Sequence, residues 1–321
     1  MTRTLIVDIP LLTAAHREAI GEAARARGFA VVFPANEAEA LAAAGRAEIL
    51  FGASLSLPKA APNLKWLCVP SAGAEPYLPK EVYANPDAVL TNSSGAYGVT
   101  IAEHTVMVAL ELMRRQLDYA AIVAARGWER ALPVHGLVGS RVTLLGTGDI
   151  GQEVAARLRA FRPAAIRGVN RSGRHSGGEF DAVVPLRGLD ALLPETDLLV
   201  MSLPGTPETT GIMDERRLRL LPADAFLVNV GRGNAVDQLA LERLLRAGHL
   251  GGAALDVFWQ EPLPPEDGLW SCPRLLITPH CAGNMTLPYT VDRIVALFLE
   301  DFDNYCAGRP LRRQVDRQKG Y

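Results

Sequence analysis

The chain has 321 residues, which is enough for about two domains of ordinary size. Hydrophobic residues make up 49% of it and charged residues 21%, a balance that excludes wholesale disorder. Its 33 basic and 35 acidic residues nearly cancel, so the composition offers no basic field for nucleic acid and no polybasic patch for a membrane. The four cysteines lack C-x-x-C spacing, which argues against a disulfide scaffold and a zinc ribbon.

The first apolar run, residues 4–9, contains Asp8, and we therefore interpret it as a β-strand and not as a signal peptide. No apolar stretch of the sequence approaches the roughly 18 residues that cross a bilayer. No cluster of His, Cys and carboxylate residues has the spacing of metal ligands. We expect a cytoplasmic protein that binds no metal, membrane or nucleic acid.

The N-terminal third alternates short β-like runs with helix-like segments at residues 12–27 and 36–44. Strands that are separated by helices indicate a parallel sheet with helical crossovers. The five strands of this part are predicted at residues 4–9, 30–33, 48–52, 64–69 and 88–91.

One long helix is predicted from about residue 100 to residue 126. Apolar residues recur at helical spacing along it, but Val106, Met107 and Leu110 add a second apolar face. A helix that is apolar on more than one face is buried on more than one side. We therefore expect this helix to lie between domains and in a subunit interface.

A second series of strands and helices begins at residue 141, which indicates a second doubly wound sheet. The last helix, residues 288–306, and the tail after it are expected to return to the N-terminal domain. The predicted fold class is therefore α/β, with two doubly wound parallel-sheet domains. The strands of the second series are predicted at 141–146, 165–170, 182–184, 198–203, 226–230, 253–257 and 275–278, and its helices at 150–160, 188–193, 214–221 and 238–247.

The motif GTGDIG follows the apolar strand VTLL directly and precedes a helix, which is the context that makes a G-x-G-x-x-G pattern informative. Gly146 permits the tight turn, Gly148 lets the backbone approach a pyrophosphate, and Gly151 lets helix and strand pack closely. The N-terminus of the helix offers unpaired N–H groups to the phosphate charge. The predicted cofactor-binding residues of this turn are Gly146, Thr147, Gly148, Asp149, Ile150 and Gly151.

The next strand end bears on the choice of cofactor. Asn170, Arg171 and Ser172 lie about 20 residues after the motif, where an acid would bind the ribose 2′-OH of NAD. No acid is present, and Arg171 can pair with a 2′-phosphate, helped by Ser172 and Arg174. The sequence therefore favours NADP(H) as the cofactor, with NAD(H) as the alternative. An exposed loop in an arginine-rich chain is the other interpretation of this segment.

Three strand ends in the second half carry charged residues. Arg232 follows one strand, Asp256 and Glu261 lie at and after the next, and His280 follows the last. In open α/β sheets, ligands bind beyond the carboxyl ends of the strands. We therefore expect Arg232, Glu261 and His280 to converge on the crevice that holds the nicotinamide.

Together these motifs resemble the D-isomer-specific 2-hydroxyacid dehydrogenase family over essentially the whole chain. The resemblance implies a Rossmann-type NAD(P)-binding domain, residues 99–285, inserted into a flavodoxin-like substrate domain, residues 1–98 plus 286–321. It also implies a homodimer built partly on the helix at 100–126. The motifs that carry the resemblance, in the order of the family, are GTGDIG at 146–151, SLPGTPETTG at 202–211, NVGRG at 229–233, DVFWQEPLP at 256–264 and TPHCAG at 278–283.

The charged residues suit the reduction of a 2-keto acid. The planar fork of Arg232 can hold the substrate carboxylate and donate to the ketone oxygen. His280 can give the developing alkoxide its proton, because histidine titrates near neutrality. A nearby Glu261 carboxylate favours the imidazolium and fixes its orientation. The resemblance implies the same three catalytic roles.

Further site residues are implied by the resemblance. The loop at 69–75 offers backbone N–H groups to the substrate carboxylate, with Ala72 and Gly73 nearest, although an ordinary strand–helix turn is the alternative. The segment at 92–98 is expected to be a hinge. Asp256 helps to place the nicotinamide carboxamide, or else has a structural role. The remaining predicted cofactor contacts are Leu203, Pro204, Thr209, Val230, Gly231, Ala282 and Gly283.

The favoured function is the NADPH-dependent reduction of a small 2-keto acid, of glyoxylate or hydroxypyruvate type, to the D-2-hydroxy acid, and the reverse reaction. One alternative is an enzyme like D-3-phosphoglycerate dehydrogenase, which would need basic residues for the phosphate; Lys59, Lys65 and Lys80 are available. The other alternative is a non-catalytic dinucleotide-sensing regulator or corepressor, which can keep the same charged residues.

Cys281 directly follows the candidate acid/base residue, where the family more often has an aliphatic residue. We interpret it as a small hydrophobe, with an alkylation-sensitive thiol as the alternative. The other histidines lack matching partners in the sequence. They are expected to be structural or exposed, and they are His16, His104, His135, His175 and His249.

Overall fold

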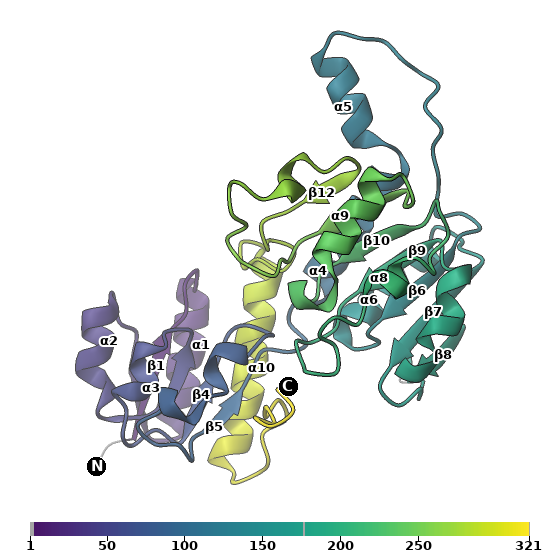
Figure 1. Cartoon of the computed structure of the whole chain (residues 1–321). Coiled ribbons are helices and arrows are strands. Elements are labelled where there is room, and N and C mark those ends of the chain that lie inside the picture. The colour runs from purple at the N-terminus through teal and green to yellow at the C-terminus, as the bar shows by residue number, and fades with distance from the viewer. Residues whose placement is uncertain (1–2, 176, 321) are drawn as a thin grey trace. The chain divides into compact units, whose positions relative to one another are not determined.

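The computed structural model describes residues 3–175 and 177–320. The chain divides into two compact units: unit 1 is Met1–Tyr97 with Met285–Tyr321, and unit 2 is Gly98–Asn284. Each unit is built on its own parallel β-sheet with helices on the faces (Figure 1). The prediction of two α/β domains with parallel sheets is therefore confirmed.

Unit 1 has a five-stranded sheet in the order β2-β1-β3-β4-β5. Its strands lie close to their predicted positions, and helices α1 and α2 begin at polar caps; Thr13 Oγ1, for example, accepts from the backbone N–H of His16 at 3.2 Å. The elements of unit 1 are β1 (Arg3–Asp8), α1 (Ala14–Ala26), β2 (Phe29–Val32), α2 (Glu37–Ala44), β3 (Ala47–Gly52), α3 (Ser56–Lys59), β4 (Trp66–Cys68), η1 (Glu75–Tyr77), η2 (Lys80–Val82), β5 (Val89–Thr91) and α10 (Pro288–Cys306).

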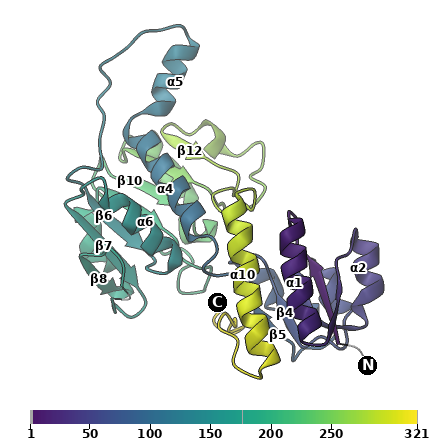
Figure 2. The same cartoon turned by 180° about the vertical axis from the view of Figure 1, so that it is seen from behind.

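The sheet of unit 1 is covered on both faces, because side chains alternate along each strand. Phe51 of β3 stacks on Phe298 of α10 with ring centroids 4.0 Å apart, whereas its neighbour Leu50 belongs to the core beneath α2 and α3. Trp66 of β4 stacks on the same Phe298 at 5.4 Å. Helices α1 and α10 lie side by side on that face (Figure 2). The last helix of the chain thus completes the core of the first sheet.

Unit 2 has a seven-stranded parallel sheet in the order β12-β11-β10-β9-β6-β7-β8. The direction of strand succession reverses between β6 and β9, which is where open α/β sheets bind nucleotides. The elements of unit 2 are α4 (Gly98–Met113), α5 (Gln116–Ala124), β6 (Arg141–Leu145), α6 (Asp149–Arg159), β7 (Ala165–Asn170), β8 (Ala182–Pro185), η3 (Leu186–Gly188), α7 (Leu189–Leu192), η4 (Leu193–Glu195), β9 (Leu198–Met201), α8 (Glu215–Leu218), β10 (Phe226–Asn229), η5 (Gly233–Ala235), α9 (Gln238–Arg246), β11 (Gly252–Leu255), η6 (Gly268–Ser271) and β12 (Leu275–Ile277).

Helices cover both faces of the second sheet. Helices α4 and α6 pack against each other on one face, and α4 also contacts β10 and β11 (Figure 2). On the other face, α9 buries Leu241, Leu244 and Leu245 in the core (Figure 1). The loops at the carboxyl ends of the strands are therefore left at one edge, where they carry the candidate site residues.

The prediction of one helix over residues 100–126 is wrong. Helix α4 ends at Met113 and α5 begins at Gln116, because Arg115 between them has a left-handed backbone with φ of +56°. The side chain of Arg115 pairs with Asp118 at 2.8 Å, and that contact holds the start of the second helix. None of the residues of α5 is buried, and the helix projects from unit 2 on an extended arm (Figure 1).

None of the described helices combines the length and the apolar character that a membrane crossing requires. Within residues 3–175 and 177–320, no three His, Cys, Asp or Glu side chains are grouped so that they would hold a metal ion. The four cysteines are free thiols.

Candidate active site

His280 and Glu261 form a close pair, as the sequence predicted for residues from two neighbouring strand ends. His280 Nδ1 lies 2.6 Å from Glu261 Oε2, and the backbone N–H of Phe258 donates to Glu261 Oε1 at 2.8 Å. A carboxylate only accepts hydrogen bonds, so Nδ1 carries a proton. The His280 side chain is 53% exposed, which leaves its Nε2 as the atom that can exchange a proton with a substrate.

The turn that carries His280 is organised by the carboxylate of Asp256. Asp256, which is 3% exposed, accepts from the Thr278 hydroxyl at 2.6 Å and from the backbone N–H groups of Cys281 at 2.9 Å and Ala282 at 3.1 Å. The N–H of His280 donates to the Asp256 carbonyl at 2.8 Å. His280 itself has φ of +50°, a left-handed conformation that non-glycine residues adopt at a cost. These contacts give Asp256 a structural role in this turn, and its contact with the nicotinamide carboxamide stays a prediction.

His104 of α4 lies directly behind this turn. Its Nε2 is 3.2 Å from the Thr278 hydroxyl and 4.0 Å from Asp256 Oδ1, and its side chain is only 11% exposed. Burial lowers the pKa of His104, and the charges of Asp256 and Glu111 oppose that shift only in part. From the sequence, His104 is expected to be structural or exposed, without a matching partner. Its contact with Thr278 is not predicted, because helix α4 and the 278–282 turn are far apart along the chain.

Arg232 projects from a loop whose backbone is packed tightly. A Cβ atom on Gly233 would lie 2.0 Å from the carbonyl carbon of Phe258, and one on Gly231 would lie 2.8 Å from the backbone of Leu203. The Asn229 side-chain amide donates to the Arg232 carbonyl at 2.9 Å. This loop leaves β10, which adjoins β11 and then β12. Arg232, Glu261 and His280 therefore follow the carboxyl ends of three adjacent strands.

The glycine turn after β6 has the shape that a dinucleotide needs. Gly146 has φ of +109°, and a Cβ atom on Gly151 would lie 2.1 Å from the Gly146 carbonyl oxygen, so neither position accepts a side chain. Nothing lies within 4 Å of a Cβ atom placed on Gly148, and Gly148 caps α6 without any side-chain hydrogen bond. The start of α6 is thus open for a pyrophosphate, and the residues present fit the cofactor.

The turn after β7 presents Arg171 and Arg174 to solvent. Asn170 shapes this turn: its Oδ1 accepts from the N–H of Gly173 at 2.7 Å, and its amide donates to the Thr147 hydroxyl at 2.8 Å. The Ser172 hydroxyl accepts from the N–H of Arg174 at 3.2 Å. Asn170 therefore ties the glycine turn to the segment that was predicted to recognise the 2′-phosphate.

The other predicted cofactor residues lie around the same strand ends. Thr209 is buried, and its hydroxyl donates to the Pro204 carbonyl at 2.6 Å and accepts from the N–H of Thr206 at 2.9 Å. The threonine therefore shapes the loop after β9 that begins at Leu203. Val230, Gly231 and Ala282 are buried with their N–H groups bonded inside the protein, and Gly283 is half-buried.

In unit 1, the loop after β4 is held by its carbonyl groups. The Ser71 hydroxyl donates to the Gly73 carbonyl at 2.6 Å, and the Asn92 amide donates to the Ala72 carbonyl at 2.7 Å. The backbone N–H groups of Ala72 and Gly73 have no acceptor among the residues that the structure describes. Two fixed, unpaired donors at one turn suit a small anion such as a carboxylate.

A model of the D-isomer specific 2-hydroxyacid dehydrogenase family, that of its NAD-binding domain, matches residues 106–282 of the chain. The chain belongs to the D-isomer specific 2-hydroxyacid dehydrogenase family. The resemblance inferred from the sequence is confirmed, and the protein is an NAD(P)-dependent oxidoreductase.

Named relatives of this 2-hydroxyacid dehydrogenase include reductases. The chain is 35% identical over 224 residues to glyoxylate/hydroxypyruvate reductase A of Salmonella newport, with 70% of each chain covered. It is 34% identical to a solved family member from Aeromonas salmonicida, with a TM-score of 0.86 over 99% of this chain and 100% of that one. It is 29% identical to the NADPH-dependent glyoxylate/hydroxypyruvate reductase of Sinorhizobium meliloti, solved with NADP and sulfate, with a TM-score of 0.81 and the same coverage.

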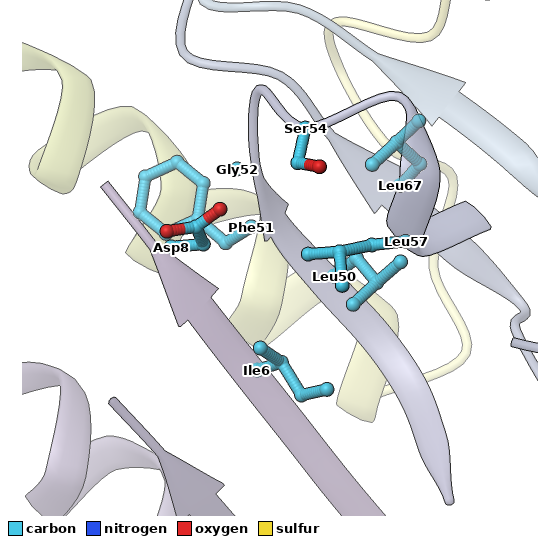
Figure 3. A pocket seen from close by; sticks show the side chains of 8 residues that line it. All are labelled: Ile6, Asp8, Leu50, Phe51, Gly52, Ser54, Leu57 and Leu67. Carbon is cyan, nitrogen blue, oxygen red and sulfur yellow. The ribbon is translucent and has the colours of Figure 1, made fainter. Parts of the chain in front are cut away.

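Unit 1 of the 2-hydroxyacid dehydrogenase has a small pocket at the carboxyl ends of β1 and β3. Its lining is apolar apart from Asp8 and Ser54 (Figure 3). Lys65 lies at the opposite edge of the sheet, where it pairs with Glu48 at 3.6 Å, and neither Lys59 nor Lys80 lines the pocket.

Cys281 of the dehydrogenase is a partly buried thiol. Burial raises the pKa of Cys281, and the nearby charge of Asp256 adds to the rise. A raised pKa lowers the fraction of the reactive thiolate at neutral pH. The structure therefore favours the interpretation of Cys281 as a small packing residue over that of a reactive thiol.

Proposed function

We propose that this protein reduces a small 2-keto acid of glyoxylate or hydroxypyruvate type to the D-2-hydroxy acid, and catalyses the reverse reaction. The observation that carries the proposal is the 2.6 Å contact between His280, which follows β12, and Glu261, which follows β11. Arg232 follows β10, which is the next strand of the sheet. A paired imidazole and a guanidinium at neighbouring strand ends suit a substrate that has a carboxylate beside a ketone. The reductases among the relatives support the same substrate class.

In this mechanism each residue has one task. Arg232 binds the substrate carboxylate and donates to the keto oxygen, and the N–H groups of Ala72 and Gly73 are proposed as donors to a carboxylate. A bound nicotinamide dinucleotide supplies the hydride. His280 donates the proton on Nε2 to the substrate oxygen as negative charge develops there, and Glu261 stabilises the protonated imidazole before the transfer. In oxidation, the neutral His280 takes the hydroxyl proton instead.

The test is a spectrophotometric screen of NADPH and NADH against glyoxylate, hydroxypyruvate, pyruvate, phenylpyruvate and phosphohydroxypyruvate. We expect turnover of glyoxylate and hydroxypyruvate. The variant His280→Ala should lose about 10²–10⁴-fold in kcat, the usual contribution of a general acid. Arg232→Ala should lose about 10²–10³-fold in kcat/KM, the usual effect of removing a donor to a developing oxyanion.

Two results would contradict this proposal. Near-normal kcat in a folded His280→Ala variant would remove the assigned proton donor. Tight nucleotide binding without turnover of any keto acid would instead point to the dinucleotide-sensing regulator, which is the remaining alternative.

The proposed cofactor is NADP(H). The observation in its favour is the exposed pair Arg171 and Arg174 at the end of β7, in a segment, residues 170–175, that contains no Asp or Glu. We expect Arg171→Ala to lower kcat/KM for NADPH about 10-fold or more and to change kcat/KM for NADH by less than about twofold, because only NADPH carries the extra phosphate. Equal losses with both nucleotides, or a wild-type preference for NADH, would show that Arg171 does not recognise the 2′-phosphate and lies in an ordinary exposed loop.

The proposed assembly is a homodimer in which the second copy of the chain buries helix α5 and the residues that follow it, 116–128. Leu117, Val123 and Trp128 are 43%, 67% and 89% exposed, and none of the residues of α5 is buried within the chain. Grouped apolar side chains of this kind mark an interaction surface. We expect light scattering to give twice the mass of the chain, and Val123→Glu to give the monomer. A wild-type monomer at micromolar concentration would contradict the proposal.

A further inference from the structure

A chain of hydrogen bonds runs from helix α4 to the turn that carries the proposed proton donor. His104 Nε2 lies 3.2 Å from the Thr278 hydroxyl, and that hydroxyl lies 2.6 Å from Asp256 Oδ1. The side chains of His104 and Asp256 are 11% and 2% exposed. Asp256 is buried, and His104 and Thr278 are half-buried. A buried carboxylate is costly unless its hydrogen bonds are made.

The donors and acceptors of this chain can be assigned from chemistry. Thr278 has a single hydroxyl proton, and the Asp256 carboxylate can only accept, so the short 2.6 Å bond takes that proton. The hydroxyl oxygen must then accept from His104, whose Nε2 carries the hydrogen. The charged groups that act on His104 are Asp256 and Glu111, and burial outweighs both in keeping its pKa low. Burial therefore favours the neutral imidazole, and the bond to Thr278 puts its proton on Nε2.

The far end of this chain holds the geometry of His280. Oδ1 of Asp256 also accepts from the Cys281 N–H at 2.9 Å, and the Asp256 carbonyl accepts from the His280 N–H at 2.8 Å. His280 has the left-handed φ of +50°, a conformation that persists only where its surroundings enforce it. The Asp256 carboxylate therefore fixes the backbone directly after His280.

We propose that His104 is a positioning residue: through Thr278 and Asp256 it holds the His280 turn in the geometry that proton transfer requires. His104 touches neither substrate nor cofactor in this scheme. The inference rests on the proposed function for its kinetic consequence, but the hydrogen-bond chain itself does not depend on any substrate.

The kinetic test compares His104→Leu, which removes the donor, with His104→Gln, whose amide N–H can reach the same hydroxyl. At saturating NADPH, we expect kcat for the best keto acid to fall at least fivefold in His104→Leu, with KM for the keto acid changed by less than twofold. His104→Gln should return kcat to within twofold of the wild type. A fall of less than twofold in His104→Leu, or equal losses in both variants, would overturn the proposal.

A double-mutant cycle tests whether the effect passes through Thr278. Thr278→Val removes the hydroxyl at nearly constant shape, and if the two residues act in series, the double variant with His104→Leu loses no more kcat than the worse single variant. Multiplied losses would show independent effects and would overturn the pathway. Thermal midpoints of all variants identify any that fail to fold.

A substrate-free measurement separates this inference from the proposed function. Long-range ¹H–¹⁵N spectra at pH 7 should show His104 protonated on Nε2 alone, and the His280 ring signals should shift or broaden in His104→Leu. If the wild type turns over no keto acid, the proposed function fails and these spectra still decide the positioning role. His280 ring signals that are unchanged in His104→Leu, or a His104 protonated on Nδ1, would overturn it.

Discussion

Glu261 uses both of its carboxylate oxygens, one for His280 Nδ1 and the other for the backbone N–H of Phe258. The backbone bond sets the direction of the carboxylate, and the remaining oxygen orients the imidazole. The size of the Glu261 side chain and its negative charge therefore act on His280 in different ways. A substitution that keeps the size and removes the charge can distinguish the two effects.

We predict that Glu261→Gln lowers kcat for keto-acid reduction at least about 10-fold, while the KM for NADPH changes little. The amide keeps the size of the side chain but no longer stabilises the protonated imidazole, which is the form that donates. Steady-state kinetics at pH 7 provide the measurement. Glu266→Gln, an exposed acid in the same loop, is the matched control and should be neutral; equal effects of the two would remove the special role of Glu261.

The sequence could predict the pairing of His280 with Glu261, because each lies in a motif directly after an apolar strand. It could not predict the contact of His104 with Thr278, because 174 residues separate them and the apolar pattern of a helix does not say which polar groups it will meet. Nor could it show that the side chains of Asn170 and Thr209 are committed to folding their own turns. Side-chain hydrogen bonds depend on tertiary placement, which local patterns do not encode.

At the level of elements, the loop that joins β10 to η5 is the most tightly packed part of the candidate site. The backbone of Phe258 lies where a side chain of Gly233 would be, and the backbone of Leu203 lies where a side chain of Gly231 would be. Arg232 between these glycines is thus held by strand–loop contacts on both sides. Because Gly231 and Gly233 have no side chains, the backbone can pack closely enough to place the Arg232 guanidinium.

Gly233→Ala is expected to destabilise the protein by at least about 1–3 kcal/mol, because a methyl group 2.0 Å from a carbonyl carbon forces the backbone to move. Gly188→Ala is the matched control in the same unit, since its Cβ atom would meet only ordinary contacts at 3.6 Å. Urea midpoints followed by circular dichroism give the comparison. A Gly233→Ala variant as stable as Gly188→Ala would show that the loop can relax.

Strands were the easiest elements to predict, since every one of them is a short apolar run between polar turns. The ends of helices were harder. The break between α4 and α5 occurs at Arg115, and nothing in the composition of residues 100–126 distinguishes this arginine from its neighbours. A left-handed residue that is neither glycine nor asparagine leaves no local signal in the sequence.

Over the whole molecule, the first and last segments of the chain meet at a buried charge in unit 1. Glu48 on β3 pairs with Arg3 of β1 at 2.8 Å and accepts from the Tyr305 hydroxyl of α10 at 2.7 Å. Burial opposes the ionisation of Glu48, but the bonds from Arg3 and Tyr305 outweigh it, so the pKa of Glu48 is lowered. The stabilisation is therefore complete above the unfolded-state pKa of about 4.3 and is lost as the pH falls through the folded-state value.

We predict that Glu48→Gln lowers the stability of the protein at pH 7 by about 1.5–3 kcal/mol, the usual worth of hydrogen bonds to a charged group. The difference from the wild type should shrink as the pH falls below about 4, because the wild-type carboxyl then becomes neutral as well. Thermal midpoints measured from pH 7 to pH 3 give the result. Glu22→Gln, an exposed acid on α1, is the control, and a difference that stays constant with pH would contradict the assignment.

The strand order of unit 2 has a practical consequence for redesign. Arg171 follows β7 and His280 follows β12, five strand spacings away in the sheet, or about 24 Å. Substitutions that far apart contribute independently to free energy. The 171–175 turn can therefore be redesigned for a different nucleotide independently of the His280–Glu261 pair. The best variants of each redesign can then be combined in one protein with additive effects.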